Sequence, residues 1–194
     1  MHDGEAELVV LVGHPRVGSR THVVARRVGE LLGAALAEPG TAVPAPGLVD
    51  LAELAPRLLD SNGNGTAEAA LRTVGEAPLL LVASPTFRGS YSGLLKLFLD
   101  LLPRYGLART VVVPLMTAGI PAHRLTVDTT LRPVLRELGA RVPVAGISVL
   151  ETELGRVDEV FASWWRGQGG KLCACLAPGD GKPAGNEMEE VGTC

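Results

Sequence analysis

Three short segments of the chain combine glycines, hydroxyls and basic or aromatic side chains, and each follows an apolar run. The first segment, residues 13–21, includes Arg16, Ser19 and Thr21 and lies between an apolar run and a helical pattern. Backbone N–H groups at a helix start bind anions, and a nearby arginine adds a charge-assisted hydrogen bond. The sequence therefore predicts a phosphate-binding loop, with an ordinary turn capped by a hydroxyl as the alternative.

The second and third segments are suited to holding a flat ring. Residues 84–93 contain a rigid Pro85 and the aromatic Phe87, so backbone N–H groups could bond a heterocycle's edge while apolar atoms lie against its face. Simple packing is the alternative for Phe87. Residues 117–123 begin with small residues, which allow a close backbone approach to a ligand. His123 could transfer a proton, although a structural role is commoner for a lone histidine at a helix start.

Other catalytic patterns are missing from the sequence. It has no Gly-x-Gly-x-x-Gly dinucleotide motif, no Gly-Lys-Ser/Thr phosphate loop and no Gly-x-Ser-x-Gly nucleophile turn. Kinase, NTPase and serine-hydrolase chemistry are therefore disfavoured. The three cysteines, Cys173, Cys175 and Cys194, lie near the end of the chain and form neither a disulfide framework nor a zinc pattern. We expect no metal site.

Apolar runs and helical patterns alternate along the chain and would position the three segments. Buried strands are expected at 7–13, 79–83, 110–116 and 142–150, and a weak edge strand at 42–51. Helices are expected at 21–37, 66–76, 92–102, 121–138 and 157–165, the fourth broken at Pro133. This alternation predicts an α/β fold, specifically a flavodoxin-like doubly wound five-stranded parallel sheet with helices on both faces. Ligands of such sheets bind at the carboxyl ends of the strands, where the three segments begin.

Composition limits the class of protein. The 194 residues carry a net charge of -3, and 46 % are hydrophobic, which predicts an ordered domain and disfavours nucleic acid and membrane surfaces as partners. No apolar run reaches the roughly 20 residues of a membrane span. The first residues include acids where a signal peptide carries Lys or Arg, so we expect a cytoplasmic protein. Composition changes near Gln168, which predicts a domain at 1–166 and a flexible Gly/Pro/Glu-rich tail at 167–194.

Taken together, the three segments resemble the NADPH-dependent FMN reductase family. The likeness covers about residues 7–150 and is carried by Gly13-His14-Pro15-Arg16-Val17-Gly18-Ser19-Arg20, Ser84-Pro85-Thr86-Phe87-Arg88-Gly89-Ser90-Tyr91-Ser92-Gly93 and Pro114-Leu115-Met116-Thr117-Ala118-Gly119-Ile120-Pro121-Ala122-His123. It is closest to the flavin reductases of two-component alkanesulfonate monooxygenase systems.

The resemblance implies a cofactor and the residues that hold it. The FMN phosphate would lie in the first loop, the isoalloxazine along the second and its pyrimidine side at the third. The residues concerned are His14, Arg16, Gly18, Ser19, Arg20, Thr21, Pro85, Thr86, Phe87, Arg88, Gly89, Thr117, Ala118 and Gly119. The flavin would take a hydride from C4 of NADPH or NADH at its N5 atom, so no protein residue need be catalytic, with His123 as a weak candidate.

Several functions remain open under this resemblance. The leading one is a flavin reductase that supplies reduced FMN to a partner monooxygenase. The alternative is a reductase that retains FMN and reduces quinones, azo compounds or another small acceptor. A flavodoxin-like electron carrier is disfavoured by the weak net charge and the arginine-containing loop. Family members imply a homodimer or homotetramer, with the contact expected at Leu94–Leu102. His14, Phe87 and Ala118 depart from the usual Ser, Tyr and Gly, and 128–130 lacks the aromatic common in members that release flavin.

Overall fold

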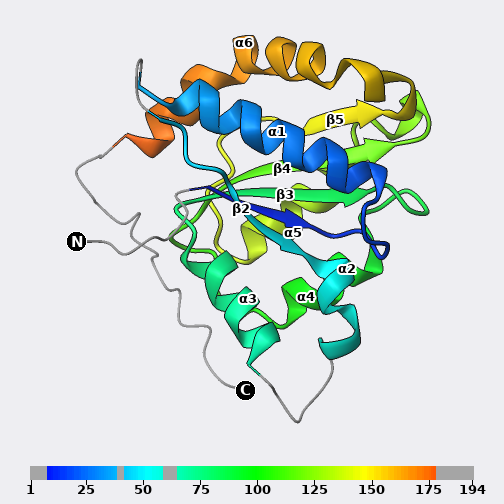
Figure 1. Cartoon of the computed structure of the whole chain (residues 1–194), viewed down its shortest axis with the longest axis vertical. Helices are drawn as coiled ribbons and strands as arrows, with labels where there is room; N and C mark the ends of the chain where they lie inside the picture. Colours follow the sequence, from blue (N-terminus) through cyan, green and yellow to red (C-terminus); the bar gives the residue numbers. More distant parts are fainter. Residues whose placement is uncertain (1–7, 39–41, 59–64, 178–194) are drawn as a thin grey trace, which may run out of the picture.

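The described part of the chain forms one parallel sheet with helices on both faces. The computed structural model describes residues 8–38, 42–58 and 65–177, and within them five strands form the sheet (Figure 1). The strands are β1 (Leu8–Val12), β2 (Gly47–Asp50), β3 (Leu79–Pro85), β4 (Val111–Ala118) and β5 (Ile147–Leu150). Their spatial order is β2-β1-β3-β4-β5, and every neighbouring pair is parallel. This is the flavodoxin-like order, so the predicted fold class is confirmed.

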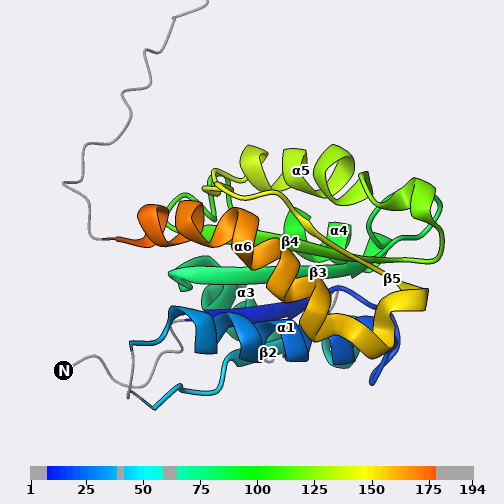
Figure 2. The same cartoon turned by 90° about the horizontal axis from the view of Figure 1, so that it is seen from above.

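Alternate residues of β1, β3 and β4 pack into two separate cores, whereas β2 contributes to one of them and β5 to the other. In β1, Leu8, Val10 and Val12 contact the core beneath α1 (Arg20–Leu36) and α6 (Val157–Leu176), whereas Val9 and Leu11 contact the other core. The second core lies beneath α2 (Leu51–Leu54), α3 (Thr66–Glu76), α4 (Gly93–Asp100) and α5 (Arg132–Glu137), and Figure 2 shows the layers from above. Strands buried on both faces explain the continuous apolar runs of the sequence.

The lengths of two strands follow from prolines. The predicted weak strand at 42–51 is the edge strand β2, which begins only after Pro46. The predicted strand at 142–150 is too long, because β5 begins at Ile147. In β4 the N–H of Val112 bonds the carbonyl of Arg141 at 2.8 Å, and the next residue with that orientation is Pro114, which has no N–H.

Residues 142–146, which precede β5, do not pair with β4. Side chains bond the backbone of this segment in place of the missing sheet hydrogen bonds. Arg132 donates to two carbonyls of this segment, and the Asp128 carboxylate accepts from the N–H of Gly146 at 2.9 Å. The indole N–H of Trp164 donates to the carbonyl of Ala145 at 2.7 Å. Side chains therefore bond several backbone polar groups of this segment in place of a strand partner.

The predicted helix at 121–138 is divided into short pieces. A 3-10 turn at Pro121–His123 and a π-helical turn at Val127–Leu131 precede α5, in which Pro133 lies within the first turn. Helical backbone continues into α5 from the π-helical turn, where the N–H of Arg132 still bonds the carbonyl of Val127, and Pro133 interrupts this bonding because it has no N–H. The predicted interruption of this helix is confirmed.

The last helix corrects the predicted domain boundary. Helix α6 continues to Leu176, so 167–176 is not part of a tail, and Leu172 is fully buried in the core beneath α1. Gly169 fits inside the helix because the ring of Trp165 occupies the place of a side chain, 2.7 Å from where a Cβ would lie. Cys173 and Cys175 are on this helix, the first exposed and the second partly buried. The rest of the predicted tail, 178–194, lies outside the described residues, and within those residues no helix is long and apolar enough to cross a membrane.

Candidate functional site

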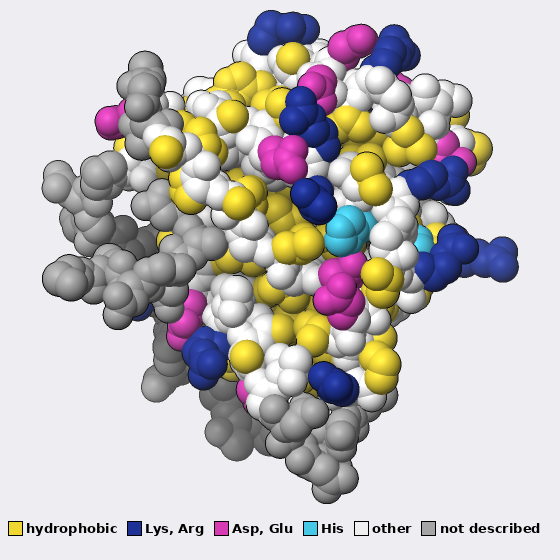
Figure 3. All heavy atoms as spheres, viewed as in Figure 1, with side chains coloured by type: hydrophobic (Ala, Val, Ile, Leu, Met, Phe, Trp, Pro, Cys, Tyr) yellow, Lys and Arg dark blue, Asp and Glu magenta, His cyan; other side chains and the backbone are white. Residues whose placement is uncertain are grey.

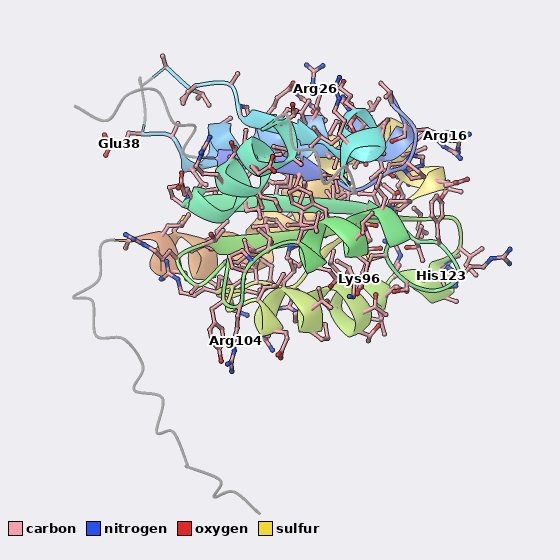
Figure 4. The ribbon with its side chains drawn as sticks, turned by 90° about the horizontal axis from the view of Figure 1, so that it is seen from below. Arg16, Arg26, Glu38, Lys96, Arg104 and His123 are labelled. Carbon is pink, nitrogen blue, oxygen red and sulfur yellow. The ribbon has the colours of Figure 1, made fainter. Side chains whose placement is uncertain are left out.

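A pocket of about 210 Å³ lies at the carboxyl ends of β1, β3 and β4. Figure 4 shows Arg16 and His123 projecting at this end of the molecule, far from Glu38. Most of the predicted site residues meet here. The lining residues are His14, Arg16, Ser19, Arg20, Thr21, Pro85, Thr86, Phe87, Thr117, Gly119, Glu151 and Leu154. The three loops chosen from the sequence thus form one cavity.

One wall of the pocket is the start of helix α1. The Ser19 hydroxyl accepts the N–H of His22 at 3.2 Å, and the first backbone bond of the helix runs from Val23 to the Ser19 carbonyl. The N–H groups of Arg20 and Thr21 precede that bond, and such groups have no intrahelical partner. They lie beside the arginines of the loop, which makes this wall suited to an anion.

His14 lines the same pocket, and its surroundings define which ring nitrogen carries the proton. Only 5 % of the residue is exposed, and its Nδ1 accepts the N–H of Arg16 at 3.0 Å. Burial lowers the pKa of His14, so the ring is neutral at neutral pH. Because Nδ1 is the acceptor, the proton of the neutral ring sits on Nε2. The ring also meets Phe87 edge to face, with centroids 5.6 Å apart.

Hydroxyl groups connect the first and third loops. The hydroxyls of Thr21 and Thr117 lie 2.7 Å apart, which joins the start of α1 to the end of β4. The N–H of Thr86 donates to the carbonyl of Thr117 at 2.8 Å and so extends the link to the second loop. The residues that line the pocket are therefore held in a common frame.

A second hydroxyl link lies beneath the pocket. The buried Ser92 hydroxyl donates to the carbonyl of Gly13 and accepts the N–H of Leu95 at 3.0 Å. The N–H of Ser92 in turn donates to the Ser84 hydroxyl at 2.9 Å. A Cβ on Gly13 would lie 2.6 Å from the Cβ of Leu95, so the loop after β1 requires glycine to pack against α4.

The second loop contains a tight two-residue turn. Phe87 and Ser90 exchange N–H···O bonds of 2.8 and 3.1 Å, and Arg88 and Gly89 between them have φ of 54° and 78°. Positive φ at both central residues is the pattern of a type I′ turn. The turn projects Phe87, which is 43 % exposed, to the rim of the pocket.

Five predicted residues do not line the pocket. Arg88 and Gly89 form the turn, and Gly18 lines a neighbouring groove. Ala118 is buried within β4 between two residues that do line the pocket, and His123 lies outside its lining.

Two lining residues were missed in the sequence analysis. Glu151 and Leu154 come from the 3-10 turn Glu151–Arg156, and the Glu151 carboxylate lies 3.0 Å from the guanidinium of Arg20. They directly follow β5, so the rule that selected the other loops would have found them. His22 and Asp50, which pair at 2.7 Å between α1 and the end of β2, also support the helix start.

One polar group of the pocket is placed to form a hydrogen bond with a ligand. Thr86 lines the pocket, and its hydroxyl is buried without a hydrogen-bond partner among the described residues. A buried hydroxyl left unbonded costs about 1–3 kcal/mol, so a bound molecule that supplies a partner would relieve that cost. With anion donors at one wall and Pro85, Thr86 and Phe87 at another, the pocket fits a molecule with a phosphate at one end and a planar heterocycle at the other.

Comparison with known proteins agrees with this chemistry. The family model described as NADPH-dependent FMN reductase matches residues 6–154. An FMN reductase (NADPH) of Pseudomonas putida strain KT2440 is 46 % identical over 85 residues, which are 44 % of this chain and 43 % of that protein. The match thus spans less than half the length of this relative.

A longer match and a solved structure extend the comparison. The NADH-dependent FMN reductase SfnF of Pseudomonas putida is 36 % identical over 138 residues, covering 69 % of this chain and 72 % of that protein. The crystal structure of an NADH:FMN oxidoreductase (EmoB) in its apo form has a TM-score of 0.64 and 28 % identity, and the superposition covers 82 % of this chain and 88 % of the other.

Proposed function

The chain belongs to the NADPH-dependent FMN reductase family, and we propose that it reduces FMN with NADPH or NADH. The observation that carries the proposal is the single pocket that joins an anion-binding helix start to a ring-sized wall with an unbonded buried hydroxyl. FMN bound there would supply the redox chemistry by accepting a hydride from nicotinamide C4 at its N5 atom.

The first loop would hold the phosphate of FMN. Arg16 and the Nε2–H of His14 would donate to the phosphate oxygens, together with the Ser19 hydroxyl and the first N–H groups of α1. Arg20, held by Glu151, adds positive charge beside them. Thr21 would shape this wall through its hydroxyl bond to Thr117, and Gly18, which lines the neighbouring groove, would allow the turn before α1 through its φ of 63°.

The second and third loops would hold the ring. Pro85 and Phe87 would lie against its face, and the free hydroxyl of Thr86 would bond a polar atom on its edge. A Cβ at Gly119 would meet nothing within 4 Å, so the backbone there leaves space for the ring. These groups position the reactants, and no acid or base of the protein is required for hydride transfer.

Anaerobic addition of NADPH or NADH to the desalted protein with FMN tests the function. Bleaching of the visible flavin band, absent without protein, is the expected result. A protein that binds FMN but leaves it oxidised with both nucleotides would be an electron carrier, and the proposal would be wrong. The same experiment on desalted protein without added FMN shows whether the chain retains its flavin, because a retained flavin would still give a visible band that bleaches.

We propose further that reduced FMN is released to a partner monooxygenase. Support comes from the rim of the pocket, where the side chain of Arg16 is exposed and Phe87 is 43 % exposed. A retained flavin after desalting would favour the alternative, reduction of quinones or azo compounds.

We also propose a homo-oligomer joined at α4, where Leu94 and Leu97 are partly buried and the adjoining Leu101 is 38 % exposed.

A further inference from the structure

A groove of about 470 Å³ lies next to the flavin pocket, between helix α1 and the segment that joins β5 to α6. We call it the α1–α6 groove. Arg20 and Leu154 line both cavities, so the groove opens from the pocket at the wall assigned to the phosphate. It is more than twice as large as the pocket and has no role in the function proposed above.

The floor of the groove is apolar. Val23 from α1 is 62 % exposed, and Leu154 and Val157 from the other side complete the surface. On this face of the molecule, basic and acidic side chains stand beside one another, with hydrophobic atoms showing between them (Figure 3). A flat heterocycle could lie against such a floor.

The rim of the groove is charged, and its arginines differ in how firmly they are held. Arg27 binds the Asp158 carboxylate through two nitrogens at 2.8 and 2.5 Å. Arg156 approaches Glu159 at 3.7 Å and is 63 % exposed in its side chain, so it can turn toward another anion at little cost. The lining has three arginines and two carboxylates, and a third carboxylate, Glu151, pairs with Arg20 at 3.0 Å from just outside the groove.

We propose that the α1–α6 groove binds an adenosine 5′-phosphate moiety, which FAD carries in addition to its FMN half and which forms one half of NAD(P)H. The proposal rests on the proposed function, because the flavin phosphate placed at Ser19 would direct the adenosine half of FAD into the groove, and NAD(P)H brings the same chemical group to the site. The next phosphate would meet Arg20 and Arg156, and the adenine would lie over Val23 and Leu154.

The substitution Val23→Glu tests this with little effect on the fold, because Val23 is exposed and lies outside the flavin pocket. A carboxylate there would repel the phosphate and disturb the apolar floor. Val43→Glu is the matched control, an exposed valine that lines neither cavity. Thermal unfolding checks that the two variants fold alike.

The measurements are the Kd of FMN and of FAD from flavin fluorescence, and the KM of NADPH with FMN as the flavin. In Val23→Glu we expect FMN binding within twofold of the unmodified protein, with either FAD binding or the KM of NADPH worse by fivefold or more. Loss of FAD affinity assigns the groove to the flavin, whereas a raised KM assigns it to the nicotinamide dinucleotide.

If the Kd of FAD and the KM of NADPH both stay within twofold, or change equally in Val43→Glu, the groove does not bind adenosine. An unmodified protein that binds no FMN would instead overturn the proposed function, and calorimetry with adenosine 5′-monophosphate would still report on the groove.

Discussion

The imidazole of His14 is held in one protonation state by its surroundings. Its Nδ1 must stay unprotonated to accept the N–H of Arg16, and burial disfavours the charged ring. If His14 holds the flavin phosphate as proposed, its ring N–H would serve as donor in a position fixed by the bond to Arg16.

The stability of the protein should depend on pH through this residue. The lowered pKa of His14 in the folded state means that the unfolded chain takes up the proton first as pH falls. The free energy of unfolding should therefore decrease as pH drops below about 6.5, the ordinary histidine value, and His14→Gln should flatten that decrease. Thermal unfolding at pH 7.5, 6.5 and 5.5 is the measurement, with His123→Gln as the control. Equal slopes for the two variants would contradict the prediction.

Arg16→Ala should weaken FMN binding by about 1.5–3 kcal/mol, the range for a hydrogen bond to a charged group, which is roughly 10- to 150-fold in Kd. Riboflavin has no phosphate, so its Kd should not change. Fluorescence titration with both flavins measures the difference. Arg26→Ala is the control, because that arginine is exposed on α1 and pairs with Glu30 at 3.7 Å. An unchanged Kd for FMN would remove Arg16 from the site.

At this scale the sequence predicted which loops meet but not how they are connected. His14, Arg16 and Phe87 could be chosen because each closely follows a buried strand, and parallel strands end at one edge. The bond between Ser92 and Gly13 joins residues 79 positions apart and has no local signal. The same is true of the hydroxyl pair of Thr21 and Thr117.

Helix α6 shows how packing can override composition. Gly169 and Gly170 have no side chains to pack, and with Gln168 they suggested the end of the domain, yet the helix passes through them. Trp165 fills the space left by Gly169, and Leu172 continues the apolar face. Conversely, α3 could be predicted at its observed bounds, because a glycine-rich stretch of sequence precedes it and its apolar residues keep helical spacing.

Neighbouring glycines of α6 should respond oppositely to the same substitution. Gly170→Ala should stabilise the protein by up to about 1 kcal/mol, since alanine favours helix and a Cβ there meets nothing within 4 Å. Gly169→Ala should destabilise it by about 1–3 kcal/mol, because the Cβ would overlap the ring of Trp165. Urea unfolding followed by tryptophan fluorescence compares the two. Stabilisation by both substitutions would show that the ring moves freely.

The folded domain of the whole molecule ends at a later residue than the sequence predicts. The layer formed by α1 and α6 includes residues 167–176, so the domain extends beyond the expected boundary at 166. Pro114 had a similar long-range effect on β5, since a residue in one strand set the start of its neighbour. Such effects cannot be predicted from local patterns, because they depend on which segments become adjacent.

Two truncations test where the domain ends. A chain ending at 166 should unfold at a much lower temperature, since removing Leu172 alone exposes a core position worth about 2–5 kcal/mol. A chain ending at 177 should unfold like the full chain, because we propose that 178–194 is dispensable for the fold. Circular dichroism melting of the three chains is sufficient. Equal melting temperatures for the two truncations would contradict the role given to α6.

The hydroxyl links beneath and beside the pocket have a kinetic consequence. Ser92, Ser84, Thr21 and Thr117 already fix the three loops to one another before a ligand arrives. Entry of a flavin then needs little rearrangement of the backbone, so its association rate should be governed by diffusion and orientation. Differences in affinity among flavins and among site variants would then appear mainly in how long each complex persists.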